Sequence, residues 1–327
     1  MPRLLRKFAK GEVYFVTNRV AEGLPFVPNA LINTFLNGIL ARSLSLHPEI
    51  DLCGYVFMGN HYHLVIVLNG GGEVLKSFME YLDGEIGKFI NRFRGKSNQN
   101  VWAKTYDAQV ILTPEAVMQK LKYMYLNPVS AGLIDSIEKY PGLSSWKSMI
   151  KDKERSYRFL GSAGLSKLPY GPLPKKTMCS IIRDKFKSSK FTDKNFLRIK
   201  PFAWVKCFSS FKDTDPLLLK EELISDIKEE EIRIRRKKSE RPTPGAQALI
   251  SQCFHKRFKS KKYQKRSPCI STCMLLREEY LEEYRDFVQR CKIAYLKYKE
   301  NFTQVNWPPG AFPPTKVPMA SLIQINA

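Results

Sequence analysis

Hydrophobic and polar positions in the first half of the chain follow two different spacings. Short runs of β-branched and aromatic residues are separated by longer stretches in which apolar residues recur at helical intervals. Turn and capping residues mark the boundaries, such as Gly59-Asn60 between two apolar runs and Asn29 before a helical pattern. The pattern predicts strands over residues 13–19, 50–58, 61–68 and 106–112, and helices over residues 29–46, 73–94 and 113–126.

The order of these elements, β-α-β-β-α-β-α, is typical of a ferredoxin-like split βαβ unit. We therefore expect an α+β fold with a mainly antiparallel sheet and with helices on one of its faces. The last of the predicted helices should end before Pro128, because proline lacks the backbone donor and clashes with the preceding turn.

Beyond residue 150 the regular pattern fades, and three parts of the chain are predicted. Residues 1–150 form a folded domain, and residues 151–176 are polar and rich in glycine and proline, which is typical of a linker. Residues 177–327 form a basic and mostly helical region whose role the sequence does not indicate. Its strongest helical pattern covers residues 274–299.

Charge is the most informative bulk property of the sequence. The 327 residues include 54 Lys and Arg against 31 Asp and Glu, a net charge of +23, which indicates a polyanionic partner and above all nucleic acid. Residues 1–150 carry only +4 of this charge, and the remainder carries +19. No run approaches the ~18 apolar residues of a membrane span. The seven cysteines are irregularly spaced, so we expect reduced thiols, a cytoplasmic location and no membrane partner.

Two of the four histidines stand together at the start of a predicted strand, in the sequence His61-Tyr62-His63. Residues two apart in a strand share a face, so both imidazoles point to one side and Tyr62 points to the other. Two neutral imidazoles on one face provide half of a divalent-metal site. The alternative is a pair of structural histidines on a hairpin.

A second candidate cluster lies on the last predicted helix of the first half. Tyr123 and Asn127 are four residues apart and therefore lie side by side, whereas Tyr125 lies on nearly the opposite face. The phenol of Tyr123 is a potential nucleophile toward phosphorus or carbon, and Asn127 offers an amide oxygen to a metal. Alternatively, Tyr123 packs in the core and Asn127 helps to end the helix before Pro128.

The segments MGNHYHLVI and YMYLNPVSAGL, in this order and at this separation, resemble the REP-associated tyrosine transposases, which belong to the HUH single-strand endonucleases. The resemblance covers residues 8–150. It implies that this domain is a metal-dependent transposase that cleaves and rejoins single-stranded DNA at hairpin-forming, REP-like palindromes through a 5′-phosphotyrosine intermediate. It also implies a prokaryotic, nucleoid-associated enzyme that uses no nucleotide cofactor.

The same resemblance implies roles for individual residues. It places one Mg²⁺ or Mn²⁺ ion on His61 and His63 with Asn127 as the third ligand, and it makes Tyr123 the nucleophile. The sequence departs from the family pattern at Phe15, where a histidine is common. It also departs after the tryptophan of VWAKTY, where an arginine is common and this chain has only Lys104.

Several basic residues are candidate contacts for the phosphates of single-stranded or hairpin DNA. One closes the first predicted strand, and most of the others gather around Phe89 and Phe93, whose rings we consider for base stacking. The alternative is a solvated helix face above two core phenylalanines. The candidates are Arg19, Lys88, Arg92, Arg94, Lys96 and Lys104.

The second half offers one further pattern, in which Cys253-Phe254-His255 is followed by Cys269 and Cys273. Cysteine and histidine in this combination are similar to the ligands of a zinc site. Structural thiols and a surface histidine are the alternative, and the sequence does not decide between them.

Two other functions stay open at this stage. A catalytically inactive, domesticated protein that binds hairpin DNA would keep the same fold and charge. A relaxase or replication initiator would share the chemistry of the HUH nickases, although these enzymes often use three histidines. The sequence also leaves open whether the protein is a monomer or a homodimer, and whether Tyr123 acts with the histidines of its own chain.

Overall fold

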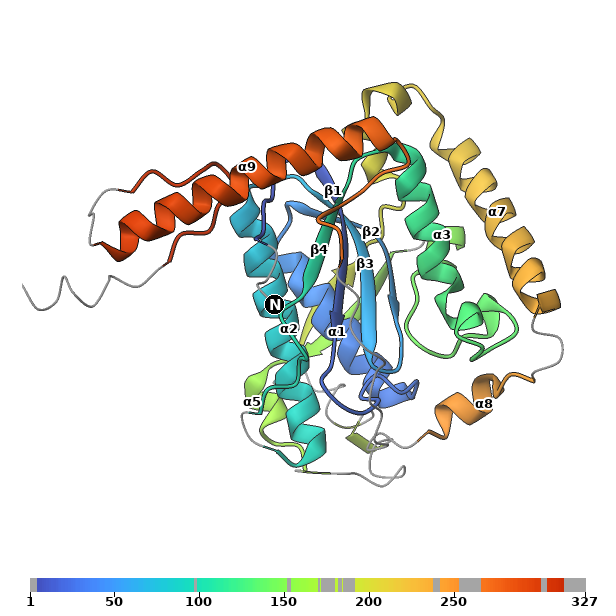
Figure 1. Cartoon of the computed structure of the whole chain (residues 1–327). Coiled ribbons are helices and arrows are strands. Elements are labelled where there is room, and N and C mark those ends of the chain that lie inside the picture. Colours follow the sequence, from blue (N-terminus) through green and yellow to red (C-terminus); the bar gives the residue numbers. More distant parts are fainter. Residues whose placement is uncertain are drawn as a thin grey trace, which may run out of the picture.

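The chain folds around a five-stranded sheet with helices on both faces (Figure 1). The computed structural model describes residues 5–96, 99–151, 154–169, 171, 180–181, 184, 192–237, 242–252, 266–300 and 305–314. The strands are β1 (Glu12–Arg19), β2 (Ile50–Phe57), β3 (His61–Leu68), β4 (Asp107–Ile111) and β7 (Cys269–Ile270), in the order β2-β3-β1-β4-β7. Every neighbouring pair is antiparallel except β4 and β7, so the predicted α+β class with a mainly antiparallel sheet is confirmed.

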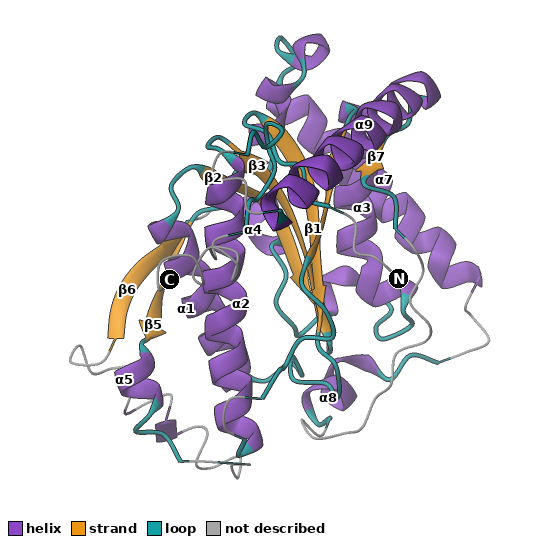
Figure 2. Cartoon of the chain, turned by 60° about the vertical axis from the view of Figure 1, so that its left-hand side comes forward, coloured by secondary structure: helices purple, strands orange, loops and turns teal. Residues whose placement is uncertain are grey.

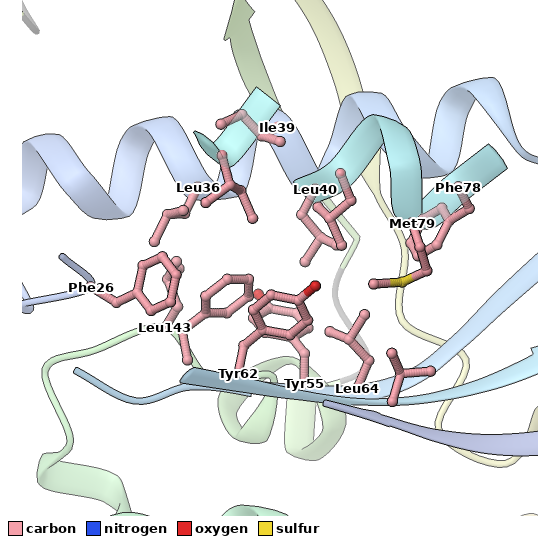
Figure 3. Close-up of a cluster of buried hydrophobic side chains, with 14 of the residues drawn as sticks. Phe26, Leu36, Ile39, Leu40, Tyr55, Tyr62, Leu64, Phe78, Met79 and Leu143 are labelled. Carbon is pink, nitrogen blue, oxygen red and sulfur yellow. The ribbon is translucent and has the colours of Figure 1, made fainter. Parts of the chain in front are cut away.

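Helices α1 (Ala30–Leu46) and α2 (Gly72–Arg94) cover one face of the sheet, where they enclose a large apolar core (Figure 3). The predicted start of α1 is confirmed, because the Asn29 side chain accepts a hydrogen bond from the backbone N–H of Ile32 at 2.8 Å. Tyr62, Leu64 and Phe78 lie in this core, so the middle residue of His61-Tyr62-His63 points toward the helices.

Helix α3 (Pro114–Ser130) lies on the opposite face, and α7 (Pro216–Lys237) packs on the outer side of α3 (Figure 1). The expectation of helices on only one face was therefore wrong. The physical reason lies in the central strands, where Val13 and Val65 are as completely buried as Tyr14 and Leu64 on the other side. A sheet that is apolar on both faces needs a cover on both.

Pro128 lies inside α3, so the prediction that the helix ends before this proline was also wrong. A proline this close to the end of a helix removes only one backbone hydrogen bond. The next turn still forms, because the N–H of Ala131 donates to the carbonyl of Asn127 at 2.8 Å. Asn127 is consequently a helical residue and not the residue that terminates the helix.

The close approach of α3 to the sheet depends on Gly54 in β2. A Cβ atom at this position would lie 2.7 Å from the terminal methyl of Met124 and 2.9 Å from the hydroxyl of Tyr125. Both distances are shorter than ordinary van der Waals contact. The glycine therefore lets the helix that carries Tyr123 lie close to the strands.

The second half of the chain contributes strands as well as helices. Strands β5 (Arg155–Leu160) and β6 (Thr192–Leu197) form an antiparallel hairpin beside α1 (Figure 2). These strands are short and polar, and their packing against α1 favours them over the helix or linker that composition suggests. The short helices are α4 (Trp146–Lys151), α5 (Ser162–Leu165) and α8 (Gly245–Ile250), with 3₁₀ turns at Ile137–Lys139, Ala203–Cys207 and Ser209–Phe211.

The predicted helix over residues 274–299 is confirmed as α9 (Met274–Lys299), which follows β7 and extends beyond the body of the molecule (Figure 1). It is anchored on the N-terminal segment, where the Tyr284 hydroxyl donates to the carbonyl of Leu5 at 2.7 Å. The ammonium of Lys7 also lies 3.2 Å from a carboxylate oxygen of Glu283. No helix in the described part of the chain combines the length and the apolar character needed to span a bilayer.

Candidate functional site

The candidate site lies where the sheet face beneath α3 changes from apolar to polar. The strand register places His63, Thr17 and Asp107 in one row across β3, β1 and β4, and it places His61 opposite Arg19 in the row beyond. Directly opposed residues in antiparallel strands point to the same side of a sheet. These five side chains therefore share one face, beside the apolar rows that pack against α3.

Both histidines are held through one ring nitrogen. Nδ1 of His63 is hydrogen-bonded to Oγ1 of Thr17 at 2.8 Å, and the His63 ring stacks on Phe15 with a centroid separation of 5.1 Å. Nδ1–H of His61 donates to the Asn60 side-chain oxygen at 2.8 Å, which leaves the lone pair on Nε2. A hydrogen bond at one ring nitrogen that orients the other is typical of histidine metal ligands.

The second ring nitrogen of His63 has no such partner. Nε2 is buried and finds no hydrogen bond within the described residues. A buried polar atom without a partner is costly, so it indicates a bound group or a functional role.

Burial keeps both imidazoles neutral. It lowers the pKa of His61 to about 3, with a further contribution from the positive charges of Arg19 and Arg266. The pKa of His63 is held well below its ordinary value by burial first, and then by His61, Arg266 and Lys120. Neutral imidazole is the form that binds metal ions, so the pair is ready to act as ligands at neutral pH.

Helix α3 brings Tyr123 to the histidines of the same chain. The rings of Tyr123 and His63 are 5.7 Å apart between centroids, and half of the Tyr123 side chain is exposed to solvent. Tyr125 is buried on the other side of the helix, where its hydroxyl lies 2.9 Å from Oγ of Ser145. Of these two tyrosines, Tyr123 is the one that a substrate can reach.

Asn127 follows Tyr123 by one helical turn and is partly buried. Its side-chain nitrogen is buried without a hydrogen-bond partner among the residues that the structure describes. The described residues contain no group of three or more His, Cys, Asp or Glu side chains that could hold a metal ion. A metal at this site would consequently depend on the two imidazoles and on a neutral ligand such as the Asn127 amide.

Lys120 is a site residue that the motifs do not reveal. Its ammonium lies 5.3 Å from the ring centroid of Tyr123 and equally far from that of Phe15. Burial lowers the pKa of Lys120, and the charge of Arg266 lowers it further. The three-residue spacing between Lys120 and Tyr123 places them on one helix face, and this signal could have identified Lys120.

Arg266 is the second residue that sequence reasoning missed. Its guanidinium donates to a carboxylate oxygen of Asp107 at 2.9 Å. Asp107 stands at the start of β4 in the same row as His63. No local signal could have identified Arg266, because only the pairing of β7 with β4 brings this distant part of the chain to the site.

The predicted DNA contacts do not gather around the histidines. Arg19 does lie there, opposite His61. In contrast, Arg92 donates to the carbonyls of Ser166 and Leu168, and Arg94 donates to that of Glu22 at 2.5 Å. These two guanidinium groups bind the backbone of neighbouring segments on the α2 side of the sheet.

Two of the remaining candidates, Lys88 and Lys96, line an open groove between α2 and α5. Lys88 forms an ion pair with Glu85 at 2.5 Å, whereas Lys96 and Lys104 are exposed. The groove has a volume of about 740 Å³, and Lys88, Lys96 and Trp102 contribute to its lining. The groove adjoins the end of β1, because the N–H of Ala103 donates to the carbonyl of Arg19 at 2.9 Å.

Of the two interpretations of Phe89 and Phe93, the structure supports core packing and not base stacking. Both rings are buried and pack on each other at 4.7 Å between centroids, and Phe89 stacks on Phe35 at 4.3 Å. Their helical spacing places them on the buried face of α2, which packs against the apolar core of the sheet.

The zinc hypothesis stays a prediction. Cys253 and His255 lie outside the described residues. Cys269 is buried in β7, and Cys273 directly precedes α9. The five cysteines in the described part of the chain carry free thiols.

Comparisons with known proteins add a structural likeness. No family model matches the sequence, and no curated protein matches it. A solved structure of a REP-associated tyrosine transposase bound to a REP hairpin is similar over 46% of this chain and 86% of that chain. The two share 15% sequence identity, with a TM-score of 0.38.

Proposed function

We propose that this protein is a metal-dependent single-stranded DNA transposase of the HUH type, which cleaves and rejoins DNA through a 5′-phosphotyrosine on Tyr123. The observation that carries the proposal is the meeting of a half-exposed tyrosine with a neutral histidine pair. One ring nitrogen of this pair is buried and has no hydrogen-bond partner among the residues that the structure describes. The resemblance of the two sequence motifs extends the proposal to hairpin-forming, REP-like palindromes as the substrate class. The proposal places Tyr123 with the histidines of its own chain, since the rings of Tyr123 and His63 lie 5.7 Å apart between centroids.

The residues present fit a divalent ion. Nε2 of His61 and of His63, together with the side-chain oxygen of Asn127, would hold it. Imidazole nitrogen is a better ligand for Mn²⁺ than for Mg²⁺, which prefers oxygen, so Mn²⁺ is the first ion to test. When bound, the ion would polarise a non-bridging oxygen of the phosphodiester and stabilise the charge that develops on attack.

Tyr123 would perform the transfer itself. Its phenolic oxygen attacks phosphorus, the new bond joins the tyrosine to the 5′-phosphate, and the bond from phosphorus to the 3′-oxygen breaks. The phenol releases its proton to solvent, and the departing 3′-oxygen takes up a proton to become a hydroxyl. One phosphodiester replaces another, so the reaction needs no nucleotide cofactor. The Lys120 ammonium, 5.3 Å from the centroid of the Tyr123 ring, adds a positive charge beside the attacking side chain.

The test is a covalent capture assay. Labelled single-stranded hairpin DNA from the flanks of the protein's own gene is incubated with Mn²⁺ or with EDTA and separated on a denaturing gel. We expect a metal-dependent protein–DNA adduct that Tyr123→Phe abolishes and Tyr125→Phe retains, with folding of both variants checked by circular dichroism. Binding of the hairpin without any adduct, equally strong in EDTA, would instead favour a DNA-binding protein without catalysis.

A further inference from the structure

We propose that Arg266 binds the phosphodiester that Tyr123 attacks, so that the C-terminal half of the chain completes the active site. This inference rests on the proposed DNA-cleaving function. It assigns a task to part of a region whose role the sequence leaves open.

The position of Arg266 is set by the pairing of β7 with the edge of the sheet. Strand β7 runs parallel to β4, and the N–H of Leu112 donates to the carbonyl of Ile270 at 2.8 Å. One residue after Arg266, the carbonyl of Ser267 accepts a hydrogen bond from the Gln109 side chain at 2.6 Å. Because Gln109 lies two residues after Asp107 on β4, this bond brings residue 266 to the start of that strand.

The same segment is also attached to the helix that carries the tyrosine. The hydroxyls of Thr272 and Thr113 lie 2.8 Å apart, and the N–H of Thr272 donates to Oγ1 of Thr113 at 3.2 Å. Thr113 is the N-cap residue of α3, directly before Pro114. The segment from Ser267 to Thr272 thus connects the edge of the sheet to α3. Arg266 directly precedes this segment, at the end that lies beside β4.

The ion pair with Asp107 places the guanidinium beside the row of residues that contains His63. Asp107, Thr17 and His63 form one row on one face of the sheet, and Thr17 is hydrogen-bonded to His63. Arg266 therefore extends the row that begins at His63. Its side chain is about one-third exposed, so it is open to a substrate.

The charges around the histidines favour an anionic ligand. Arg19 lies opposite His61 on the neighbouring strand, the Lys120 ammonium is 5.3 Å from the Tyr123 ring centroid, and Arg266 is paired with Asp107 in the row of His63. Partly buried like charges repel one another, and a bound anion relieves this repulsion. A guanidinium suits a phosphodiester in particular, because its planar donors match the geometry of the phosphate oxygens.

The test compares Arg266→Gln with Arg285→Gln, which removes the same charge from an exposed position on α9. The capture assay is run with ordinary hairpin DNA and with DNA that carries a neutral methylphosphonate at the cleaved linkage. With ordinary DNA we expect Arg266→Gln to slow adduct formation about 10- to 100-fold, the usual effect of losing a hydrogen bond to a charged group. Arg285→Gln should match the unmodified protein.

With the methylphosphonate, the difference in the rate of adduct formation between Arg266→Gln and the unmodified protein should shrink, because the charge that the guanidinium recognises is gone. If Arg266 has a merely structural role, Arg266→Gln will form the adduct more slowly by the same factor on both substrates, and this result would overturn the inference. A variant that forms the adduct as fast as the unmodified protein would overturn it too. Arg266→Lys keeps the charge without the planar donors, should react at an intermediate rate, and supplies the test if the glutamine variant fails to fold. If the unmodified protein forms no adduct, the proposed function itself fails, and this inference fails with it.

Discussion

Tyr62 and His63 point to opposite faces of the central sheet, and the two side chains differ in how their polar groups are paired. On the α2 face, the Tyr62 hydroxyl donates to Asp83 at 2.5 Å, and the Asn18 side chain donates to the other carboxylate oxygen at 2.7 Å. On the α3 face, His63 leaves Nε2 buried and unpartnered within the described part of the chain. Hydrogen bonds that are complete stabilise a fold, whereas a buried atom left without one is available to a ligand.

This comparison teaches that the density of charge along a sequence is a poor guide to a site. The cations of α2 lie close together in the sequence, yet Arg92 and Arg94 bind backbone carbonyls. Arg19, Lys120 and Arg266 are far apart in the sequence, yet they surround the histidines. Tertiary convergence, and not local composition, distinguishes the face that carries the candidate site.

The largest expected effect is on the α3 face. Replacing His63 with glutamine removes a proposed metal ligand, so we expect adduct formation to fall more than about 100-fold. In the unmodified protein, Mn²⁺ at 100 times its dissociation constant should stabilise the fold by about 2.7 kcal/mol, and His63→Gln should lose this gain. Thermal melts with Mn²⁺ and with EDTA measure the difference, and an Mn²⁺ shift that survives the substitution would contradict the assignment.

A smaller effect is expected for Tyr62 on the α2 face, where a substitution should lower stability and leave activity unchanged. Tyr62→Phe removes a buried hydroxyl and leaves Asp83 with one hydrogen bond fewer, which should lower the free energy of unfolding by about 1–3 kcal/mol. The Mn²⁺ shift and the adduct should persist in the folded protein. Urea denaturation checks the first expectation and the capture assay the second. Loss of activity without loss of stability would show that the two faces are not separate in function.

The third expected effect is the dependence of stability on pH. Burial raises the pKa of Asp83 from 3.8 to about 7, so the folded protein holds this proton more tightly than the unfolded chain does. Stability from this group should therefore fall as pH rises from about 4 to about 7, by at most about 1.4 kcal/mol per pH unit. The histidines act in the opposite sense, because lowered pKa values make stability rise with pH below about 6.5.

Asp83→Asn separates the contribution of Asp83 to the pH dependence of stability from that of the histidines, since it removes only the former. As pH rises toward 7, the unmodified protein should lose free energy of unfolding steadily relative to this variant. Urea titrations at several pH values measure this difference. A difference that stays constant with pH would show that Asp83 does not carry the proton.

Much of the first half of the fold follows from local patterns. The apolar periodicity predicts β1, β2, β3, α1 and α2 closely, and the cap at Asn29 predicts where α1 begins. These features depend on the spacing of neighbouring residues, which a sequence displays directly. The sequence leaves open whether Tyr123 acts with the histidines of its own chain, and the structure brings the rings of His63 and Tyr123 together within one chain.

The features that were missed depend on contacts between distant segments. Strand β7 has only two residues, so no periodicity could reveal it, and Arg266 reaches the site only through that strand. Pro128 is tolerated because the helix around it is packed on the sheet through Gly54. Weak local signals of this kind are decided by tertiary packing, which overrides propensity.

Strand β7 also has a consequence for the order in which the protein is made. A nascent chain emerges from the ribosome N-terminus first, so both histidines and Tyr123 are available long before residue 266 is synthesised. Until β7 pairs with β4, the early site lacks Arg266 and its ion pair with Asp107. If Arg266 acts as proposed, the ability to cut DNA efficiently arrives only after most of the chain has been translated, and a prematurely terminated chain would be a poor nuclease.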